Sequence, residues 1–302
     1  MSPILATYIP LAFFILAFVI AATLFKYWEW STRRAKKKSP LTQDLLRGPG
    51  ESLREKIDDM TLDLLGYMAG LILVPLMIYS MFLSEYVFNP SQKRTPYIVV
   101  IGLCVVFLCY LVKKIISHLK LRRKYNLGLE AEVAVGQELN LLMRKGYWVF
   151  HDFPADSFNI DHIVIGENGV FAIETKGRPK RPNKSGKIEA EVVYDGARLS
   201  FPGWYESKPI EQAQAQARWL QNWLTQIVGE SVAAQPILTL PGWYIKRTNQ
   251  KGIPVINGKN PSIFFERYGK QTLSEKLVNQ IVFHVDQKCR TVAPRSYRAP
   301  PS

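Results

Sequence analysis

The sequence predicts an α/β domain, a mixed β-sheet flanked by helices, which follows a transmembrane region of three α-helices. Two β-branched runs on either side of a Gly/Asn turn, between residues 159 and 176, predict a hairpin. Apolar residues recur at helical spacing on both sides of this hairpin, in 129–144 and in 210–227. Three separate apolar stretches, each near the length of a membrane span, lie before residue 113.

The first apolar stretch, Ile4 to Phe25, is uncharged and is followed rather than preceded by basic residues. A cleaved signal peptide carries its positive charge before the apolar run. We therefore expect this stretch to be a membrane anchor.

The second and third apolar stretches are Leu64 to Ser84 and Tyr97 to Val112. Lysine and arginine crowd the segments 26–60 and 113–124 and are few between the second and third stretches. The positive-inside rule then places the N-terminus outside and residues 113–302 in the cytoplasm. We expect a multi-pass protein of a bacterial-type inner (plasma) membrane, held in the lipid bilayer by three spans.

Composition restricts the partners. The net charge of +14 predicts an anionic partner, either nucleic acid or an anionic membrane surface. The cysteines Cys104, Cys109 and Cys289 show neither metal-ligand spacing nor a disulfide framework, which fits a reducing compartment for the polar part. The sequence lacks a glycine-rich phosphate-binding loop of the ATPase type, so no nucleotide cofactor is expected.

The hairpin gathers charge at one end. A four-residue loop at 166–169 would pair Ile165 with Val170 and set Asp161 opposite Glu174. Because side chains alternate along a strand, both carboxylates and Lys176 share one otherwise apolar face. Unpaired buried charges are unfavourable, and a divalent cation held by the two carboxylates would resolve this. The alternative is an ordinary hairpin whose charged end points into water.

The region around this hairpin resembles a known family over roughly 125–245. The resemblance rests on Gly128-Leu129-Glu130-Ala131-Glu132, Asn159-Ile160-Asp161-His162, Glu174-Thr175-Lys176, Asp195-Gly196, Pro209-Ile210-Glu211-Gln212 and Gln235-Pro236-Ile237-Leu238. This order and spacing is similar to that of the NERD (nuclease-related) domain, a branch of the PD-(D/E)xK superfamily. Ala131 stands where the family usually has glycine.

The resemblance implies a restriction-endonuclease-like core that cleaves nucleic acid with Mg²⁺ or Mn²⁺. The chain then divides into a transmembrane helix at 1–25, a cytoplasmic basic loop at 26–60, two further transmembrane helices with a short external loop at 61–117, the nuclease-related domain at 118–288 and a disordered tail at 289–302.

The expected site follows from the hairpin and the family. The catalytic groups are Lys176, Glu174, Asp161 and Gln212; the metal ligands are Asp161, Glu174, Glu132 and the backbone carbonyl of Thr175; the nucleic-acid contacts are Arg178, Lys180, Arg181, Lys184 and Lys187. Gln212 and, as a less favoured choice, Gln216 lie on the helix that opens at Ser207-Lys208-Pro209. Packing alone would also account for these glutamines, and a solvated loop for the basic residues.

We thus expect a membrane-anchored, metal-dependent endonuclease that hydrolyses phosphodiester bonds of nucleic acid, with DNA favoured, at the cytoplasmic face. One alternative is a catalytically inactive, membrane-tethered module that binds nucleic acid or a protein partner, because fold does not guarantee chemistry. Another is a basic surface that meets anionic lipid. Related nucleases frequently act as dimers, which leaves a homodimer open.

Overall fold

The structure is a computed structural model that describes residues 9–34, 40–88, 97–182, 186, 188–261, 264–265, 268–269 and 271–294. The chain divides into two compact units. One unit holds the described residues of 1–42 and 58–122 with Pro294, and the other holds 43–57 and 123–293. Two long helices contribute residues to both units.

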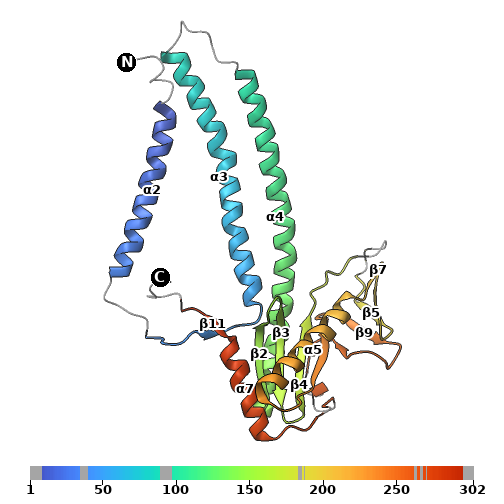
Figure 1. The fold of residues 1–302 in the computed structure, drawn as a ribbon. Helices are drawn as coiled ribbons and strands as arrows, with labels where there is room; N and C mark the ends of the chain where they lie inside the picture. Colours follow the sequence, from blue (N-terminus) through green and yellow to red (C-terminus); the bar gives the residue numbers. More distant parts are fainter. Residues whose placement is uncertain are drawn as a thin grey trace. The chain divides into compact units, whose positions relative to one another are not determined.

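Three helices make up most of the first unit. They are α2 (Ile9–Arg34), α3 (Glu51–Phe88) and α4 (Tyr97–Asn140). Helices α3 and α4 run side by side (Figure 1), and the Tyr67 ring of α3 meets the His118 ring of α4 edge-on, with ring centroids 5.1 Å apart. Gly70 keeps the two helices close, since a Cβ atom there would lie 3.1 Å from Leu111.

Two helices are long and apolar enough to cross a membrane, over Glu51–Val87 and Ile98–Lys145. The count of three spans expected from the sequence is not confirmed, because the apolar part of α2 that the structure describes, Ala12–Tyr27, is shorter. Helix α4 also continues without a break through Gly128 into the stretch 129–140. Intrahelical hydrogen bonding continues there, and a short 3₁₀ turn, Leu141–Lys145, ends the element instead.

The second unit is built on a five-stranded mixed sheet. Its strands are β2 (Trp148–Pro154), β3 (Asn159–Gly166), β4 (Gly169–Thr175), β8 (Ala234–Thr239) and β10 (Val255–Ile256). Their order is β10-β8-β4-β3-β2; β10, β8 and β4 are parallel, and β4, β3 and β2 are antiparallel. The predicted mixed sheet with flanking helices is therefore present. Every residue of β4 is buried, as expected for a central strand covered on both faces.

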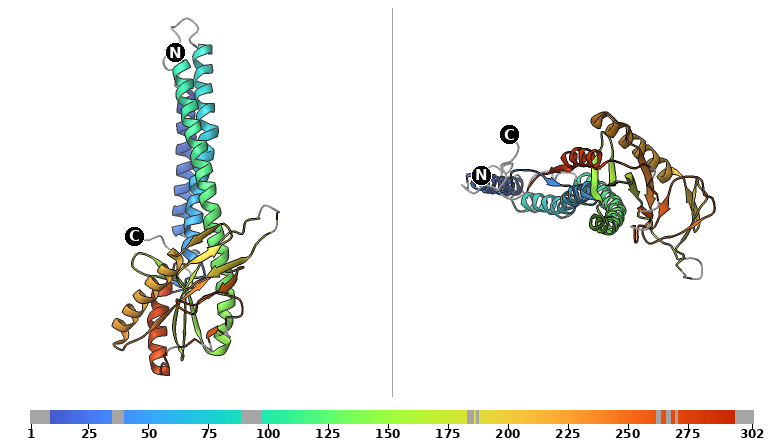
Figure 2. Two further views of the ribbon diagram at one scale, coloured as in Figure 1. Left: turned by 90° about the vertical axis from the view of Figure 1, so that its right-hand side faces the viewer. Right: turned by 90° about the horizontal axis from the view of Figure 1, so that it is seen from below.

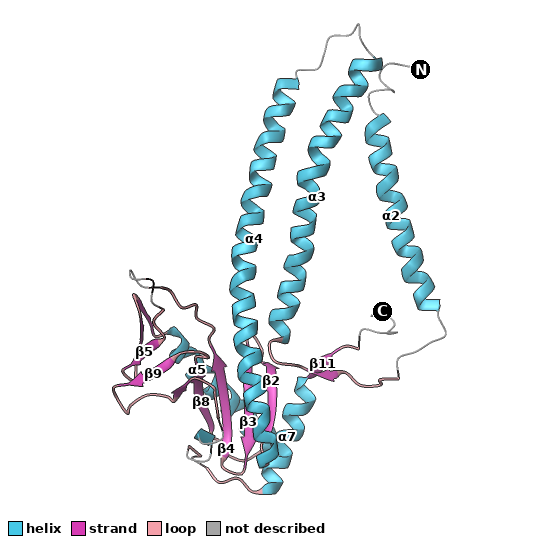
Figure 3. Ribbon diagram, turned by 180° about the vertical axis from the view of Figure 1, so that it is seen from behind, coloured by secondary structure: helices cyan, strands magenta, loops and turns pink. Residues whose placement is uncertain are grey.

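Helices cover both faces of this sheet. On one face lie α5 (Lys208–Val228) and α7 (Glu275–Cys289), whose apolar stripes pack on Ile163, Ile165 and Ala172. On the other face, the last turns of α4 bring Val135 and Leu139 against Phe171 (Figure 3). Helix α5 begins with a proline in its first turn, where the missing N–H is harmless, and ends at a left-handed glycine.

A second, four-stranded sheet follows the order β7-β6-β5-β9. Its strands are β5 (Glu191–Tyr194), β6 (Leu199–Phe201), β7 (Trp204–Glu206) and β9 (Tyr244–Arg247). It lies at the edge of the domain away from α7 (Figure 2). One of its faces packs on the start of α5 and the end of β8, through Ile210, Ala213 and Leu240.

A segment far from the predicted domain completes the second unit. Strand β1 (Leu45–Leu46) pairs antiparallel with β11 (Arg290–Val292). Residues 43–57, which the sequence assigns to a basic loop, thus belong to the same compact unit as the five-stranded sheet. The tail expected to be disordered from Cys289 is likewise structured up to β11, because it gains a partner strand; residues 295–302 lie outside the described residues.

Candidate active site

The hairpin has the predicted register. Ile165 pairs with Val170 and His162 with Ile173, which is the last pair of the ladder, so Asp161 and Glu174 face each other one residue beyond its end. The turn is tighter than expected, because Gly166 and Gly169 also pair. The two carboxylates therefore meet at the end of the hairpin, on the side that α5 covers.

Glu174 is only 1% exposed, and both of its carboxylate oxygens are engaged. The Lys176 ammonium forms a short ion pair with Oε1. The side-chain amide of Gln216 donates to Oε2 at 2.6 Å. Burial raises the pKa of Glu174, and the Lys176 charge opposes this. Together, the lysine and the amide fix the orientation of the carboxylate.

Asp161 lies beside Glu174, half-buried, and accepts the backbone N–H of Thr175 on Oδ2 at 2.6 Å. Burial, together with the carboxylates of Glu174 and Glu132, raises the pKa of Asp161 well above its usual range. Thr175 is buried, and its hydroxyl lies 2.8 Å from that of Thr239 on β8. These contacts hold the ends of three neighbouring strands together at the site.

Helix α4 brings a third carboxylate to the same place. Glu132 is 8% exposed, and burial with the charges of Asp152 and Glu174 raises its pKa to about 8. The helix can approach because Gly177, the residue after Lys176, has no side chain; a Cβ there would lie 2.6 Å from the Leu127 carbonyl oxygen.

These groups suit a hard divalent cation, although the described residues hold no ready-made cage of three or more His, Cys, Asp or Glu ligands. Burial raises the pKa of all three carboxyls, and the charge of Glu174 adds to the rise for Asp161 and Glu132. Oxygen ligands of this type are the ones that Mg²⁺ prefers. Asp161, Glu174 and Glu132 would hold such an ion in their ionised forms.

The helix α5 contributes a different glutamine from the one favoured by the sequence. Gln216 is 2% exposed and contacts Glu174, and it also donates to the backbone oxygen of Asn159 at 3.2 Å. Its own side-chain oxygen is buried and lacks a hydrogen-bond partner within the described part of the chain. Gln212 lies one turn earlier and is half-buried. The structure therefore brings Gln216 to the carboxylates.

The basic loop after β4 is only partly available for phosphate. Arg178 makes a two-pronged ion pair with Glu206 on β7, at 2.8 and 2.9 Å. The Lys180 ammonium lies 5.8 Å from the centre of the Trp243 ring and, like Arg181, is exposed. The two remaining predicted contacts, Lys184 and Lys187, lie outside the described residues.

Asp152, which the sequence analysis does not single out, connects several segments of the domain through hydrogen bonds. It is 1% exposed and has a left-handed backbone, with φ of 47°. It accepts hydrogen bonds from the guanidinium of Arg47, the backbone and hydroxyl of Ser52, and the amide of Asn159, at 2.5 to 2.9 Å. A lone aspartate within a strand gives no signal of this role, because both arginine and serine come from about 100 residues upstream.

His162 lies on the opposite face of β3 from Asp161, and its Nδ1 is 2.9 Å from Nδ1 of His151. His151 Nε2 lies 3.0 Å from the side-chain oxygen of Asn140, which accepts, so Nε2 carries the hydrogen. Burial lowers the pKa of His151 to about 4 and that of His162 well below its usual range. The pair is therefore neutral and structural.

An α/β domain with carboxylates and a lysine gathered at the end of a central hairpin has the organisation of a nuclease-like domain. The comparison with known families agrees: residues 127–241 match the family model NERD, described as a nuclease-related domain. This part of the chain is a nuclease-related domain, and its match runs from the last turns of α4 to just beyond β8. No curated protein and no solved structure matches the chain.

Proposed function

We propose that this chain is a membrane-anchored nuclease that hydrolyses phosphodiester bonds of nucleic acid, with DNA the favoured substrate, at the cytoplasmic face. The observation that supports this most directly is the convergence of Asp161, Glu174 and Lys176 at one end of a buried hairpin, inside a nuclease-related domain. A bound Mg²⁺ or Mn²⁺ would neutralise negative charge on the phosphate and lower the pKa of a water molecule.

The side chains have distinct roles in this proposal. Asp161, Glu174 and Glu132, with the Thr175 carbonyl as a further oxygen, would hold the ion. The Lys176 ammonium, held on Glu174 and 22% exposed, would orient the attacking water and stabilise negative charge on the phosphate in the transition state. Gln216 would keep the Glu174 carboxylate in place, and Gln212 stays a candidate for contact with the phosphate or the water.

Membrane anchoring is supported by the surface of helices α3 and α4. Only 6% of the residues in the most apolar window of each helix are buried. In water such surfaces would be unfavourable, whereas lipid accepts them. The lysines and arginines that follow residue 112 support a cytoplasmic location of the domain.

The test uses the full chain in a neutral detergent. We expect it to cut linear, supercoiled or single-stranded DNA, or RNA, with Mg²⁺ or Mn²⁺ but not with EDTA, and to lose cutting on Asp161→Asn. Glu167→Gln is the matched control, because Glu167 is an exposed carboxyl at the other end of the same hairpin. Cutting that survives Asp161→Asn would remove this site from the chemistry. Salt-sensitive binding without cutting would favour the inactive binding module.

A further inference from the structure

The outer face of the four-stranded sheet displays residues that suit unpaired bases. On the inner face Val192, Tyr194 and Leu199 are fully buried. Strand alternation directs the intervening residues outward. Ser200 pairs with both Val193 and Tyr205, and Val193 pairs with Lys246, so these four residues form one row across the sheet.

Two tyrosines stand open on this face. Tyr205 on β7 is 71% exposed and Tyr244 on β9 is 66% exposed. Aromatic rings on the inner face behave differently: Phe201 and Trp204 stack on each other, with ring centroids 4.0 Å apart. Tyr205 and Tyr244 thus keep most of their surface open to solvent.

Beside Tyr205 the surface is hollowed. The hollow is about 530 Å³ and is lined by Arg198, Ser200, Phe201, Gly203, Trp204 and Tyr205. The Arg198 guanidinium lies 5.0 Å from the centre of the Tyr205 ring. An aromatic ring, a planar cation and a hydroxyl in one hollow are the groups with which proteins hold a splayed-out base.

The charge around the face suits a polyanion. Residues 242–252 contain no acidic side chain and place Lys246 on this face, whereas Arg247 is held by backbone carbonyl oxygens and the buried Tyr194 ring. Lys246 pairs with Glu191 at 3.6 Å and Arg198 with Asp195 at 3.9 Å, and all four side chains are at least 44% exposed. Exposed pairs of this kind contribute little, so both cations can turn to a phosphate.

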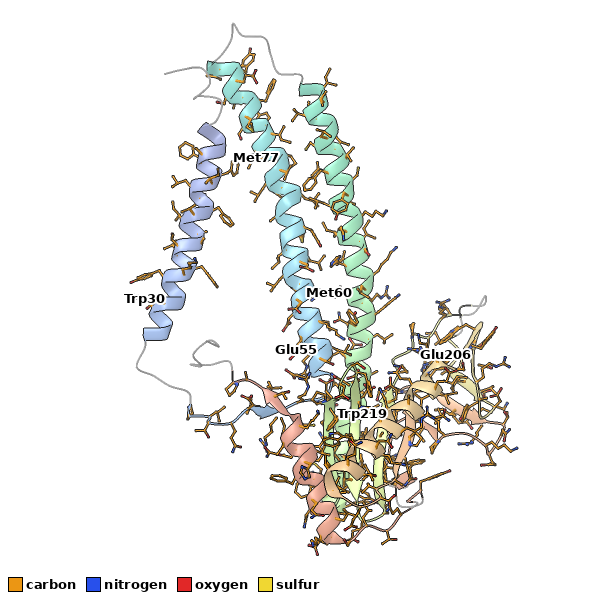
Figure 4. The ribbon with its side chains drawn as sticks, in the orientation of Figure 1. Trp30, Glu55, Met60, Met77, Glu206 and Trp219 are labelled. Carbon is orange, nitrogen blue, oxygen red and sulfur yellow. The ribbon has the colours of Figure 1, made fainter. Side chains whose placement is uncertain are left out.

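The face is connected to the active site through β7. Glu206, labelled in Figure 4, neighbours Tyr205 in sequence and pairs with Arg178, two residues after Lys176. The chain that leaves the catalytic strand is therefore fastened to the edge of this sheet.

We propose that this outer face binds an unpaired stretch of the substrate strand by stacking bases on Tyr205 and Tyr244. The inference rests on the proposed nuclease function and extends it by naming single-stranded nucleic acid, or a single-stranded end or flap, as what the domain grips. A duplex is disfavoured because its bases are stacked on one another and offer no free face.

The test measures binding without cutting. The full chain in neutral detergent, with EDTA, is titrated into a fluorescent single-stranded oligonucleotide and, separately, its duplex, with anisotropy as the readout. We expect Tyr205→Ala to weaken single-strand binding at least about fivefold, the lower end for one base–aromatic stack. Tyr205→Phe should bind like the wild type, and duplex binding should change little.

Phe283→Ala is the matched control, because Phe283 is 60% exposed but lies on α7. Tyr244→Ala tests the second ring independently, should Tyr205→Ala fail to fold. Unchanged single-strand binding in both alanine variants, or an equal loss for duplex and single strand, would overturn the inference. Cutting of DNA or RNA by the wild type in Mg²⁺ tests the proposed nuclease separately. If the wild type cuts but Tyr205→Ala binds the single strand as well as the wild type, only the proposed stacking face is refuted. If Tyr205→Ala weakens single-strand binding but the wild type does not cut, only the proposed nuclease activity is refuted.

Discussion

Glu132 makes the stability of the domain depend on pH. Its pKa is about 8 in the folded chain, against 4.5 for a free glutamate, so the folded state binds the proton more tightly. Between these values the unfolded state loses its proton first, and stability falls as pH rises. For this group alone the loss is about 1.4 kcal/mol for each pH unit in that window. We expect Glu132→Gln to flatten the decline in melting temperature measured in EDTA.

Cations should counter that decline. Because Mg²⁺ competes with protons for the carboxylates, it should raise the melting temperature more at pH 8 than at pH 5. Glu130→Gln is the matched control, since Glu130 is exposed on the same helix. A pH profile that is the same for Glu132→Gln and the wild type would show that this carboxyl is not the buried acid inferred here.

Gln216 and Gln212 offer a comparison of two like residues one helical turn apart. Gln216→Ala removes the amide that donates to Glu174 and leaves Oε2 of that buried carboxylate without this donor. Gln212→Ala, in contrast, changes a half-buried side chain. We expect the Gln216 variant to lower kcat by roughly tenfold or more, as a disturbed supporting contact to a ligand commonly does. Gln212→Ala should have the smaller effect, and the reverse order would restore Gln212 as the functional glutamine.

The two glutamines also show which part of the site the sequence can predict. The carboxylates follow from strand alternation and a short turn, both of which are local, so Asp161 opposite Glu174 could be derived. The choice between Gln212 and Gln216 depends on how α5 is rotated on the sheet. That rotation is set by packing of Ala217 and Leu220 against residues far away in the chain, which a helical stripe alone does not determine.

At the level of elements, the segment 43–57 is fastened to the core through Arg47. Its guanidinium contacts buried Asp152 and also donates to the Thr291 hydroxyl at 3.1 Å. The backbone N–H of Arg47 donates to the carbonyl oxygen of Cys289. The Arg47 and Asp152 side chains are 10% and 2% exposed. We expect Arg47→Ala to reduce the free energy of unfolding by roughly 3 kcal/mol, because Asp152 is left charged and buried.

A nearby arginine provides the control for this prediction. Arg54 pairs with Glu51 at 3.7 Å but is 47% exposed, so Arg54→Ala should change stability by less than about 1 kcal/mol. Chemical denaturation of both variants in detergent measures the difference. Equal effects would mean that the ion pair with Asp152 does not hold the segment in place.

This segment also shows which kind of secondary-structure element the sequence alone does not predict. Helix α5 and the hairpin β3–β4 carry their own periodicity and turn signals, and the sequence predicts them correctly. Strand β1 has two residues and no periodicity, and it exists only because β11 lies beside it. The boundary of the nuclease-like unit therefore could not be drawn at residue 118, since its first strand precedes both long helices.

At the level of the whole molecule, the proposed membrane anchoring rests on the exposed apolar residues of α3 and α4. Ile98, Leu103 and Val106 of α4 are 86%, 67% and 68% exposed. A charged residue at the centre of a spanning helix costs about 2.5 to 3.5 kcal/mol for insertion. Val106→Arg should therefore reduce the fraction of chain that stays in membranes after alkaline extraction, whereas Lys114→Arg, at the basic end of the same stretch, should leave it unchanged.

The proposed orientation can be measured on the same membranes. If the nuclease-like domain is cytoplasmic, protease added to inverted vesicles should cleave it and protease added to right-side-out vesicles should spare it, with detergent exposing it in both. An active nuclease in that position meets nucleic acid inside the cell, and an outward domain would meet only what lies outside. Protection in inverted vesicles would reverse the inferred topology and move the substrate to the outer side, because the lysines and arginines after residue 112 would then no longer mark the cytoplasmic end.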